Sequence, residues 1–277
     1  MSVTLDALVL PAFDDLEGFT GEDEPWRRAY DFEPTPVEGL SRPLLCTDSG
    51  LGLVPTGIGT TAAATTTATL CASGAVDLDD ALVCSVGVAG GPPALPIGSV
   101  VLADSIVDWD DKCRFDPEEG SPPLAPNPYT EGQGHFGIDP GLLARAEALA
   151  SGVSLDPPAV TAGADAAPTV VTGANLCGDE LWHGRELAEQ ASWLVEQYDA
   201  GPYCATEMED AGTAAALERF GHLDRYLSVR GISNHDRQRG DESARESFFD
   251  PRFEDGFEVG LENAVAVARA IVDDRLA

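Results

Sequence analysis

Short apolar runs alternate with amphipathic segments along this chain, and this pattern predicts strands alternating with helices. The runs suited to buried strands cover residues 5–11, 51–56, 81–86, 97–106, 169–172 and 226–232. The helical signals cover residues 61–73, 140–151, 183–198 and 254–276. With no internal repeat and no long linker, the alternation predicts one α/β domain over residues 1–277.

Breaker residues mark the connections between these elements. Gly57-Ile58-Gly59 forms a turn before the first long helix, and Gly87–Gly91 is predicted to form a loop after the strand at 81–86. Asp139-Pro140 combines an N-cap with proline at the first helical position. Residues 108–135 are rich in Pro, Asp and Gly and are predicted to form a long surface loop or lid.

The charge balance is strongly acidic. The 48 acidic residues outnumber 16 basic residues and give a net charge of −32, and Lys112 is the only lysine. Such a surface repels nucleic acid and anionic membranes, so neither is an expected partner. At ~1 M salt the Debye length is roughly 3 Å, which removes most of the self-repulsion. We therefore expect a halophilic protein in a high-salt cytoplasm.

Cysteine usage and hydropathy further narrow the class of protein to which the chain can belong. The six cysteines show neither a CxxC pair nor histidines at metal-ligand spacing, so we expect reduced thiols and no metal site. The chain opens without a basic signal-peptide region. Residues 49–76 are uncharged, but their threonines, glycines and Pro55 do not suit a spanning helix, so we expect a soluble cytoplasmic protein.

Two polar segments point to one site. Glu207 and Glu209 stand where an extended segment turns into a helix, and the strand at 226–232 ends in Ser233-Asn234-His235-Asp236. Loops at the carboxyl ends of neighbouring strands converge on one crevice. A carboxylate there can accept two sugar hydroxyls while an amide faces a heterocycle, which suits a nucleoside.

These segments resemble the nucleoside phosphorylase superfamily, and the fuller pattern is closer to its purine nucleoside permease branch. The resemblance covers most of the chain. It rests on five blocks in order: residues 8–13, 56–60, 87–91 followed by 97–100, 173–175 running into 178–184, and 203–237 with Met208-Glu209-Asp210 and Arg230-x-x-Ser233-Asn234-x-Asp236. It implies a three-layer fold with a central mixed, twisted sheet flanked by helices, and a homo-oligomer by analogy.

The resemblance also implies roles at the sugar and the base. Glu209 would bind the 2′- and 3′-hydroxyls, the alternative being a first-turn helix acid. Met208 would lie under the sugar or in the core, and Glu207 would be a further sugar-side residue. Asn234 stands where nucleosidases place an aspartate, and its amide can hydrogen-bond N7 and O6 of a 6-oxopurine. Asp236 is the candidate acid or orienting group, so Asn234 and Asp236 are the catalytic candidates.

The remaining predicted contacts surround these residues. The backbone of Gly87, Val88, Ala89 and Gly90 would approach the ligand closely. Further candidates are Asn175 and Trp182 at the base, and His183 at the 5′-hydroxyl or as a bridge between two loops. Arg230 is expected to pair with a carboxylate.

The signal for a second substrate is weak. Val88 occupies the position of a phosphate-binding hydroxyl, and residues 80–91 contain no basic residue. The weak candidates for phosphate are Gly59, Thr60 and Thr61. We therefore expect no cofactor, with phosphate as a possible co-substrate, and cleavage of a purine nucleoside at its N-glycosidic bond by phosphate or water. The alternative is a non-catalytic nucleoside-binding or uptake protein.

Overall fold

A mixed sheet forms the centre of the protein. The computed structural model describes residues 2–14, 16, 18–116, 123–130, 132–159, 166–249 and 253–277. In this part of the chain the central sheet has ten strands. They are β2 (Ala7–Leu10), β3 (Glu33–Thr35), β4 (Leu44–Cys46), β5 (Leu51–Leu53), β7 (Leu82–Gly91), β8 (Val100–Asp108), β11 (His135–Gly137), β12 (Val170–Cys177), β13 (Tyr203–Glu207) and β14 (Tyr226–His235). The pairs β1 (Val3–Thr4) with β6 (Val76–Asp77) and β9 (Lys112–Arg114) with β10 (Leu124–Pro126) lie outside it.

Five of these strands pair in succession to form a closed ring. β8 pairs with β12, β12 with β13, β13 with β7, β7 with β14, and β14 again with β8. The ring mixes parallel and antiparallel contacts, and it leaves β2, β5, β4 and β3 as an extension beside β7. Because β13 and β14 both border β7, their carboxyl-terminal residues are brought to one strand.

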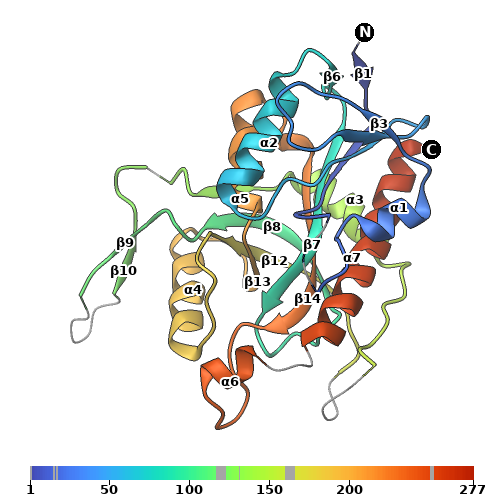
Figure 1. Ribbon diagram of the computed structural model, residues 1–277. Coiled ribbons are helices and arrows are strands. Elements are labelled where there is room, and N and C mark those ends of the chain that lie inside the picture. Colours follow the sequence, from blue (N-terminus) through green and yellow to red (C-terminus); the bar gives the residue numbers. More distant parts are fainter. Residues whose placement is uncertain are drawn as a thin grey trace.

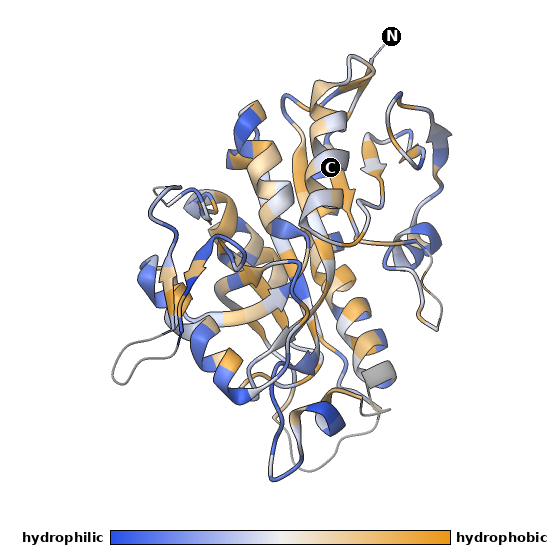
Figure 2. Cartoon of the chain, turned by 60° about the vertical axis from the view of Figure 1, so that its left-hand side comes forward, coloured by the Kyte–Doolittle hydropathy of each residue, from blue (hydrophilic) through white to orange (hydrophobic). Residues whose placement is uncertain are grey.

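Helices cover both sides of this sheet, as predicted. Figure 1 shows α2 (Thr60–Ala72), α5 (Asp210–Phe220) and α4 (Arg185–Gln197) on one side and α7 (Phe253–Leu276) on the other. α2 packs on α5, whereas α7 packs on β14 and β7 with α1 (Glu24–Ala29) and α3 (Pro140–Ala150) beside it. In Figure 2 the central strands are mostly hydrophobic and α7 alternates hydrophobic with polar positions along its length.

Two local predictions are corrected by the strand boundaries. Gly87–Gly91, expected as a loop, forms the second half of β7, because Arg230, Gly231, Ile232, Asn234 and His235 of β14 pair with it. β14 therefore runs three residues past the predicted end at 232 and includes Asn234. By contrast, the predicted start of α3 is confirmed: the Asp139 carboxylate accepts a hydrogen bond of 2.8 Å from Leu142 N.

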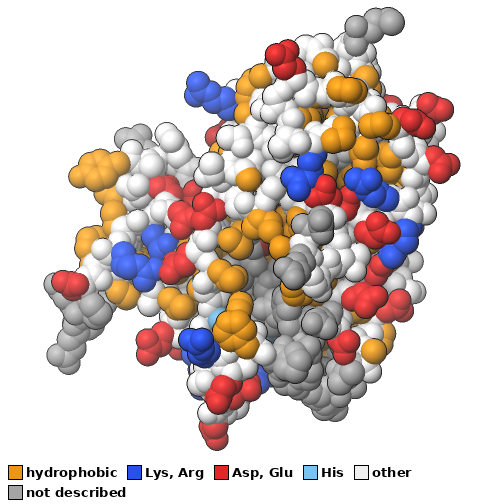
Figure 3. All heavy atoms as spheres, viewed as in Figure 1, with side chains coloured by type: hydrophobic (Ala, Val, Ile, Leu, Met, Phe, Trp, Pro, Cys, Tyr) orange, Lys and Arg blue, Asp and Glu red, His pale blue; other side chains and the backbone are white. Residues whose placement is uncertain are grey.

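The predicted surface loop at 108–135 contains regular structure. β9 and β10 form an antiparallel hairpin and β11 pairs with β8. Residues 117–122 and 131 of this segment lie outside the described residues. Two short elements complete the chain, η1 (Leu223–Arg225) before β14 and α6 (Ala244–Phe248) after it. Figure 3 shows acidic side chains spread over the whole visible face rather than gathered in one patch.

Candidate functional site

The junction of β13 and α5 carries three acidic residues in a row of four. Glu207 is the last residue of β13, Glu209 precedes α5, and Asp210 is its first residue. Glu207 Oε2 accepts hydrogen bonds from Glu209 N at 2.8 Å and Asp210 N at 3.0 Å, so Glu207 satisfies the first amides of α5. Glu209, by contrast, makes no side-chain cap to α5. Its carboxylate is therefore not used to cap α5.

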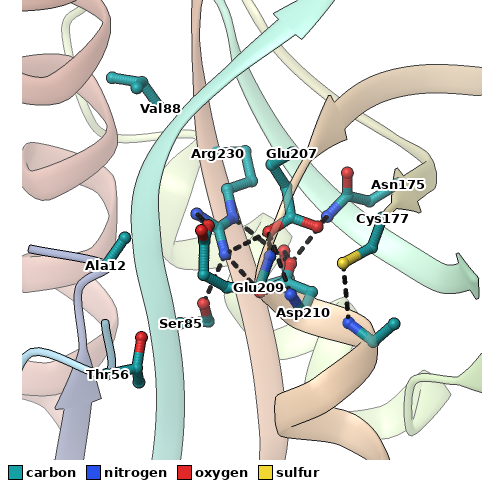
Figure 4. A network of polar contacts seen from close by, with 12 residues as sticks. Ala12, Thr56, Ser85, Val88, Asn175, Cys177, Glu207, Glu209, Asp210 and Arg230 are labelled. Carbon is teal, nitrogen blue, oxygen red and sulfur yellow. Dashed lines mark hydrogen bonds and ion pairs between the residues drawn. The ribbon is translucent and has the colours of Figure 1, made fainter. Parts of the chain in front are cut away.

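Arg230 lies at the centre of these acids (Figure 4). Its guanidinium is 2.9 Å from Glu207 Oε2 and 3.7 Å from Glu209 Oε2, and it also pairs with Asp210. Arg230 Nη2 donates to Ser85 Oγ at 2.7 Å. The residue is 1% exposed. The expectation that Arg230 pairs with a carboxylate is confirmed.

Asn175 supports the acidic cluster from β12. Its Nδ2 donates to Glu207 Oε1 at 3.1 Å and to Asp210 Oδ2 at 2.7 Å, and the residue is fully buried. Tyr226 and Ser228 of β14 donate to Asp210 from the other side. Asn175 therefore orients two carboxylates, and its predicted contact with a base stays a prediction that this geometry does not favour.

Burial and the charge of the Arg230 guanidinium shift the pKa values of the three carboxyls in different directions. Burial raises the pKa of Glu207 to about 8 and that of Glu209 to about 7, against the opposing charge of Arg230. Burial alone would also raise the pKa of Asp210, but the charge and hydrogen bonds of Arg230 outweigh it and the pKa is lowered. Asp210 is thus the partner of Arg230 that is ionised at neutral pH, and the two glutamates can gain or lose protons near neutral pH.

Gly90 of β7 joins the two predicted halves of the site. It pairs with Thr206 of β13 and with Asn234 of β14. A Cβ on Gly90 would lie 3.3 Å from Thr206 Cγ2 and 3.4 Å from Asn234 Nδ2, so both side chains reach over this glycine. Gly90, Thr206 and Asn234 are all half-buried, as are nearby Val88 and Met208. Thr206, one residue before Glu207, and the Asn234 amide therefore lie against one half-buried stretch of β7.

Glu22 is a buried acid of this region that the sequence analysis missed. Its Oε2 accepts from Ala12 N at 2.7 Å and its Oε1 from Val88 N at 2.9 Å. A Cβ on Gly87 would lie 2.4 Å from Glu22 Oε1, so that glycine makes room for the carboxylate. Burial raises the pKa of Glu22, opposed by the charge of Arg230. No sequence signal marked it, since it lies in an irregular acidic segment and its contact with Val88 joins residues 66 positions apart.

The second catalytic candidate, Asp236, is firmly held. It is 1% exposed and accepts a hydrogen bond of 2.8 Å from Tyr203 Oη. Arg237 donates to both of its oxygens, at 2.6 and 2.9 Å. Its backbone also joins Gly91 and Gly184. These contacts favour an orienting role over proton donation, and the catalytic assignment stays a prediction.

Trp182 and His183 lie in the segment that follows β12. Trp182 is 8% exposed and stacks obliquely on Trp109 with ring centroids 6.0 Å apart, inside a small hydrophobic cluster. His183 contacts the Phe248 ring edge-on at 5.7 Å, and both its ring nitrogens are buried without a hydrogen bond. Burial lowers the pKa of His183. Among the described residues no hydrogen bond or ring contact links Trp182 or His183 to the Arg230 cluster, and their ligand roles stay predictions.

Gly59, Thr60 and Thr61, the weak candidates for phosphate binding, lie at the start of α2. Carboxylates of the protein accept hydrogen bonds from the backbone amides there. Gly59 N donates to Glu209 Oε1 at 3.1 Å and Thr60 N donates to Asp179 Oδ1 at 2.7 Å. The positive end of the α2 dipole is thus already compensated. Within the described residues no group of three or more His, Cys, Asp or Glu side chains is placed to hold a metal ion. All six cysteines are free thiols.

The fold and this site define the class of protein. The purine nucleoside permease family model matches residues 8–277, so the chain belongs to that family. No helix in the described part of the chain combines the length and apolar character that crossing a membrane requires. Comparison with curated protein sequences gave no match.

Solved structures place the fold among nucleoside-cleaving enzymes, as the resemblance predicted. The 5′-methylthioadenosine/S-adenosylhomocysteine nucleosidase of Neisseria meningitidis, in complex with methylthio-immucillin-A, is 19% identical with a TM-score of 0.64 over 98% of this chain and 99% of that one. The corresponding enzyme of Colwellia psychrerythraea 34H, in complex with adenine, is 20% identical with a TM-score of 0.66 over 100% and 96%. Futalosine hydrolase of Helicobacter pylori is 18% identical with a TM-score of 0.63 over 98% and 97%.

Proposed function

We propose that this protein binds a purine nucleoside and cleaves its N-glycosidic bond with water. One observation carries the proposal: Thr206, which leads into the glutamate turn, and Asn234 both lie against Gly90. A single small ligand over this stretch of β7 can then meet a carboxylate at one end and an amide at the other. The similarity to nucleosidases crystallised with a purine or a purine-like inhibitor supports the same class of ligand.

Glu209 is assigned to the ribose. Its Oε1 accepts from Gly59 N, and Oε2 has only the longer contact of 3.7 Å to Arg230 among the interactions of the described residues. An ionised carboxylate with an uncommitted oxygen can accept a hydrogen bond from a sugar hydroxyl. Two cis hydroxyls would engage both oxygens. Met208, half-buried beside it, supplies an apolar contact for the sugar ring.

Asn234 is assigned to the base. Its Oδ1 accepts a hydrogen bond of 2.9 Å from Ser233 Oγ, and its Nδ2 contacts the carbonyl oxygen of His235 at 3.2 Å. The second hydrogen on Nδ2 can donate to N7 of a purine. Such a bond stabilises the charge that the leaving base develops as the glycosidic bond breaks. Asp236, held by Tyr203 and Arg237, fixes the end of β14 that carries Asn234.

The charge of the site favours water over phosphate as the acceptor. Glu207, Glu209 and Asp210 surround the single Arg230 guanidinium, and Glu22 adds a further buried carboxyl in its field. A phosphate dianion needs spare positive charge, and this cluster has none to offer. Water has no such requirement, and a carboxylate whose pKa is raised by burial, as that of Glu22 is, can take its proton. Glu22 is the group we assign to that role.

Binding without cleavage is the second candidate, and Asn234 is the observation that favours it. An amide has no titrating proton to give to the departing base, so cleavage would depend on hydrogen bonding alone or on solvent. In a protein that only binds the nucleoside, the same amide would recognise the base, and the missing proton would not matter.

One assay separates these functions. The purified protein is incubated in molar KCl with inosine, guanosine or adenosine, with and without phosphate, and free base is measured. We expect base release that does not depend on phosphate, and loss of release with retained nucleoside binding in Glu22→Gln. Phosphate-dependent release would refute hydrolysis, binding without release would support the second candidate, and neither binding nor release would refute both.

A further inference from the structure

Two carboxylates from different loops meet at the first amides of α2. Asp179 follows β12 and accepts from Thr60 N at 2.7 Å, whereas Glu209 follows β13 and accepts from Gly59 N at 3.1 Å. α2 has no acidic residue in its first turn and no side-chain cap of its own. The amides of the N-cap Gly59 and of the first helical residue Thr60 are therefore satisfied from outside the helix, each by a different carboxylate.

Close packing fixes the start of α2 relative to Asp179 and Glu209. Gly59 has φ +97°, and a Cβ there would lie 2.9 Å from Asp179 Oδ1. A Cβ on Gly212 of α5 would lie 2.0 Å from Thr60 O, so the two helix backbones touch at this point. Asp179 is itself anchored, because its backbone N donates to Asp110 Oδ2 at 2.7 Å. The positions of Asp179 and Glu209 are thus set relative to the same two amides.

Glu209 and Asp179 compete for these amides. A carboxylate at a helix N-terminus can accept from neighbouring N–H groups with both of its oxygens, and the helix dipole favours this. With Thr60 N held by Asp179, Glu209 uses only Oε1 on α2, and its Oε2 stays on the side of Arg230. We propose that Asp179 is a positioning residue of the nucleoside site, which limits Glu209 to one contact with α2 and so keeps its second oxygen available to a sugar hydroxyl. This inference rests on the proposed function.

The direct test compares loss of a cap at this helix with loss of a cap at a remote one. Asp179→Ala removes the carboxylate, and Asp179→Asn keeps an acceptor oxygen without the charge. Asp139→Ala is the matched control, because Asp139 caps α3 through a 2.8 Å hydrogen bond and is also exposed. Asp179 is exposed as well, so the variants leave the core intact.

Affinity for a nucleoside and for its free base is measured by calorimetry in molar KCl. We expect Asp179→Ala to raise the Kd of the nucleoside about tenfold, which is the lower end of the range for losing one hydrogen bond to a charged group. Asp179→Asn should raise it less. The free base lacks the sugar, so its Kd should be unchanged in both variants. Asp139→Ala should lose thermal stability without changing either Kd.

A pH profile adds a result that a purely structural role would not produce. Glu209 faces Arg230 from β14, Asp210 from α5, Glu207 from β13 and Glu22 from the segment before α1. In Asp179→Ala, Glu209 would gain the Thr60 amide and lose a neighbouring negative charge, and both changes favour its ionised form. The pH at which nucleoside binding weakens should therefore move down in that variant.

The outcomes are distinguishable. Wild-type Kd values and an unchanged pH profile in Asp179→Ala would overturn the positioning role while leaving the proposed function intact. Equal weakening of nucleoside and free base would also overturn it, because the effect would not pass through the sugar contact. A wild-type protein that binds no nucleoside would instead reject the proposed function, and this inference with it.

Discussion

Replacing Arg230 with methionine tests the electrostatic core of the site. The substitution keeps a long unbranched side chain and removes the only guanidinium that contacts Glu207, Glu209 and Asp210 in the described structure. Removing one partner of a buried ion pair leaves uncompensated charge and costs about 3–5 kcal/mol. Since Arg230 is 1% exposed, water screens little of this cost. We expect Arg230→Met to lower the free energy of unfolding by about that amount at neutral pH.

The direction of each pKa shift decides how the stability of the folded protein changes with pH. In the native protein, burial raises the pKa of Glu207 to about 8 and that of Glu209 to about 7 from the ordinary value of 4.5, so the folded state binds more protons than the unfolded state. Their contribution to stability therefore falls as pH rises through this window. Asp210 behaves in the opposite way, because its pKa is lowered and its contribution is lost only in acid. Without Arg230, burial would raise the pKa of Asp210 too.

The assay is urea unfolding in molar KCl between about pH 5 and pH 8. We expect the loss in Arg230→Met to be smallest at the acid end, where the carboxyls are protonated, and largest at the basic end. Arg145→Met is the control, since Arg145 pairs with Asp274 and its side chain is 66% exposed, and exposed pairs contribute less than about 1 kcal/mol. A loss as small as the control, or one that does not vary with pH, would refute the reasoning.

The remaining predictions concern ligand binding, packing and salt. Glu209→Gln should raise the Kd of a nucleoside about tenfold, as removal of a charged acceptor does, and unchanged calorimetric binding would exclude Glu209 from the site. Because ionised Glu209 is the acceptor and its pKa is raised to about 7, adenosine affinity should increase as pH rises through 7; a flat profile would contradict this. Trp182→Ala should lower the free energy of unfolding by about 3–5 kcal/mol, because Trp182 packs on Trp109; a change confined to binding would argue against this packing role. The melting temperature should rise between ~0.1 M and ~1 M KCl as repulsion within the acidic surface is screened, and an unchanged temperature would contradict the halophilic prediction.

The order of elements could be predicted from sequence because it depends on local patterns. Apolar runs and helical stripes located β2, β7, β14 and α7 near their observed positions. The ends of strands were harder to predict from the sequence. Gly87–Gly91 looks like a loop because glycine is rare within strands, yet pairing with β14 makes it the second half of β7. Register between distant strands, which decides this, leaves no local mark on either segment.

The pairing of Arg230 with a carboxylate was predicted from the sequence and is confirmed. Glu209 and Asn234 were reached from the motif and the chemistry of their side chains, and their roles at a ligand stay predictions. Glu22 was not reached, because the sequence alone does not distinguish a single acid in an acidic, irregular segment from the other acids around it. Only its two hydrogen bonds, to Ala12 N and Val88 N, set it apart.

What the sequence determined by itself is therefore the class of fold, the net charge of −32 and the two segments that carry the candidate chemistry. These follow from periodicity, composition and side-chain type, all of which act over a few residues. The tertiary structure alone decided which acids share one guanidinium, that Glu207 rather than Glu209 caps α5, and that Asp179 and Glu209 divide the first amides of α2. The first and the last depend on the distance between groups far apart in the chain, and the cap depends on the local backbone geometry at the end of β13.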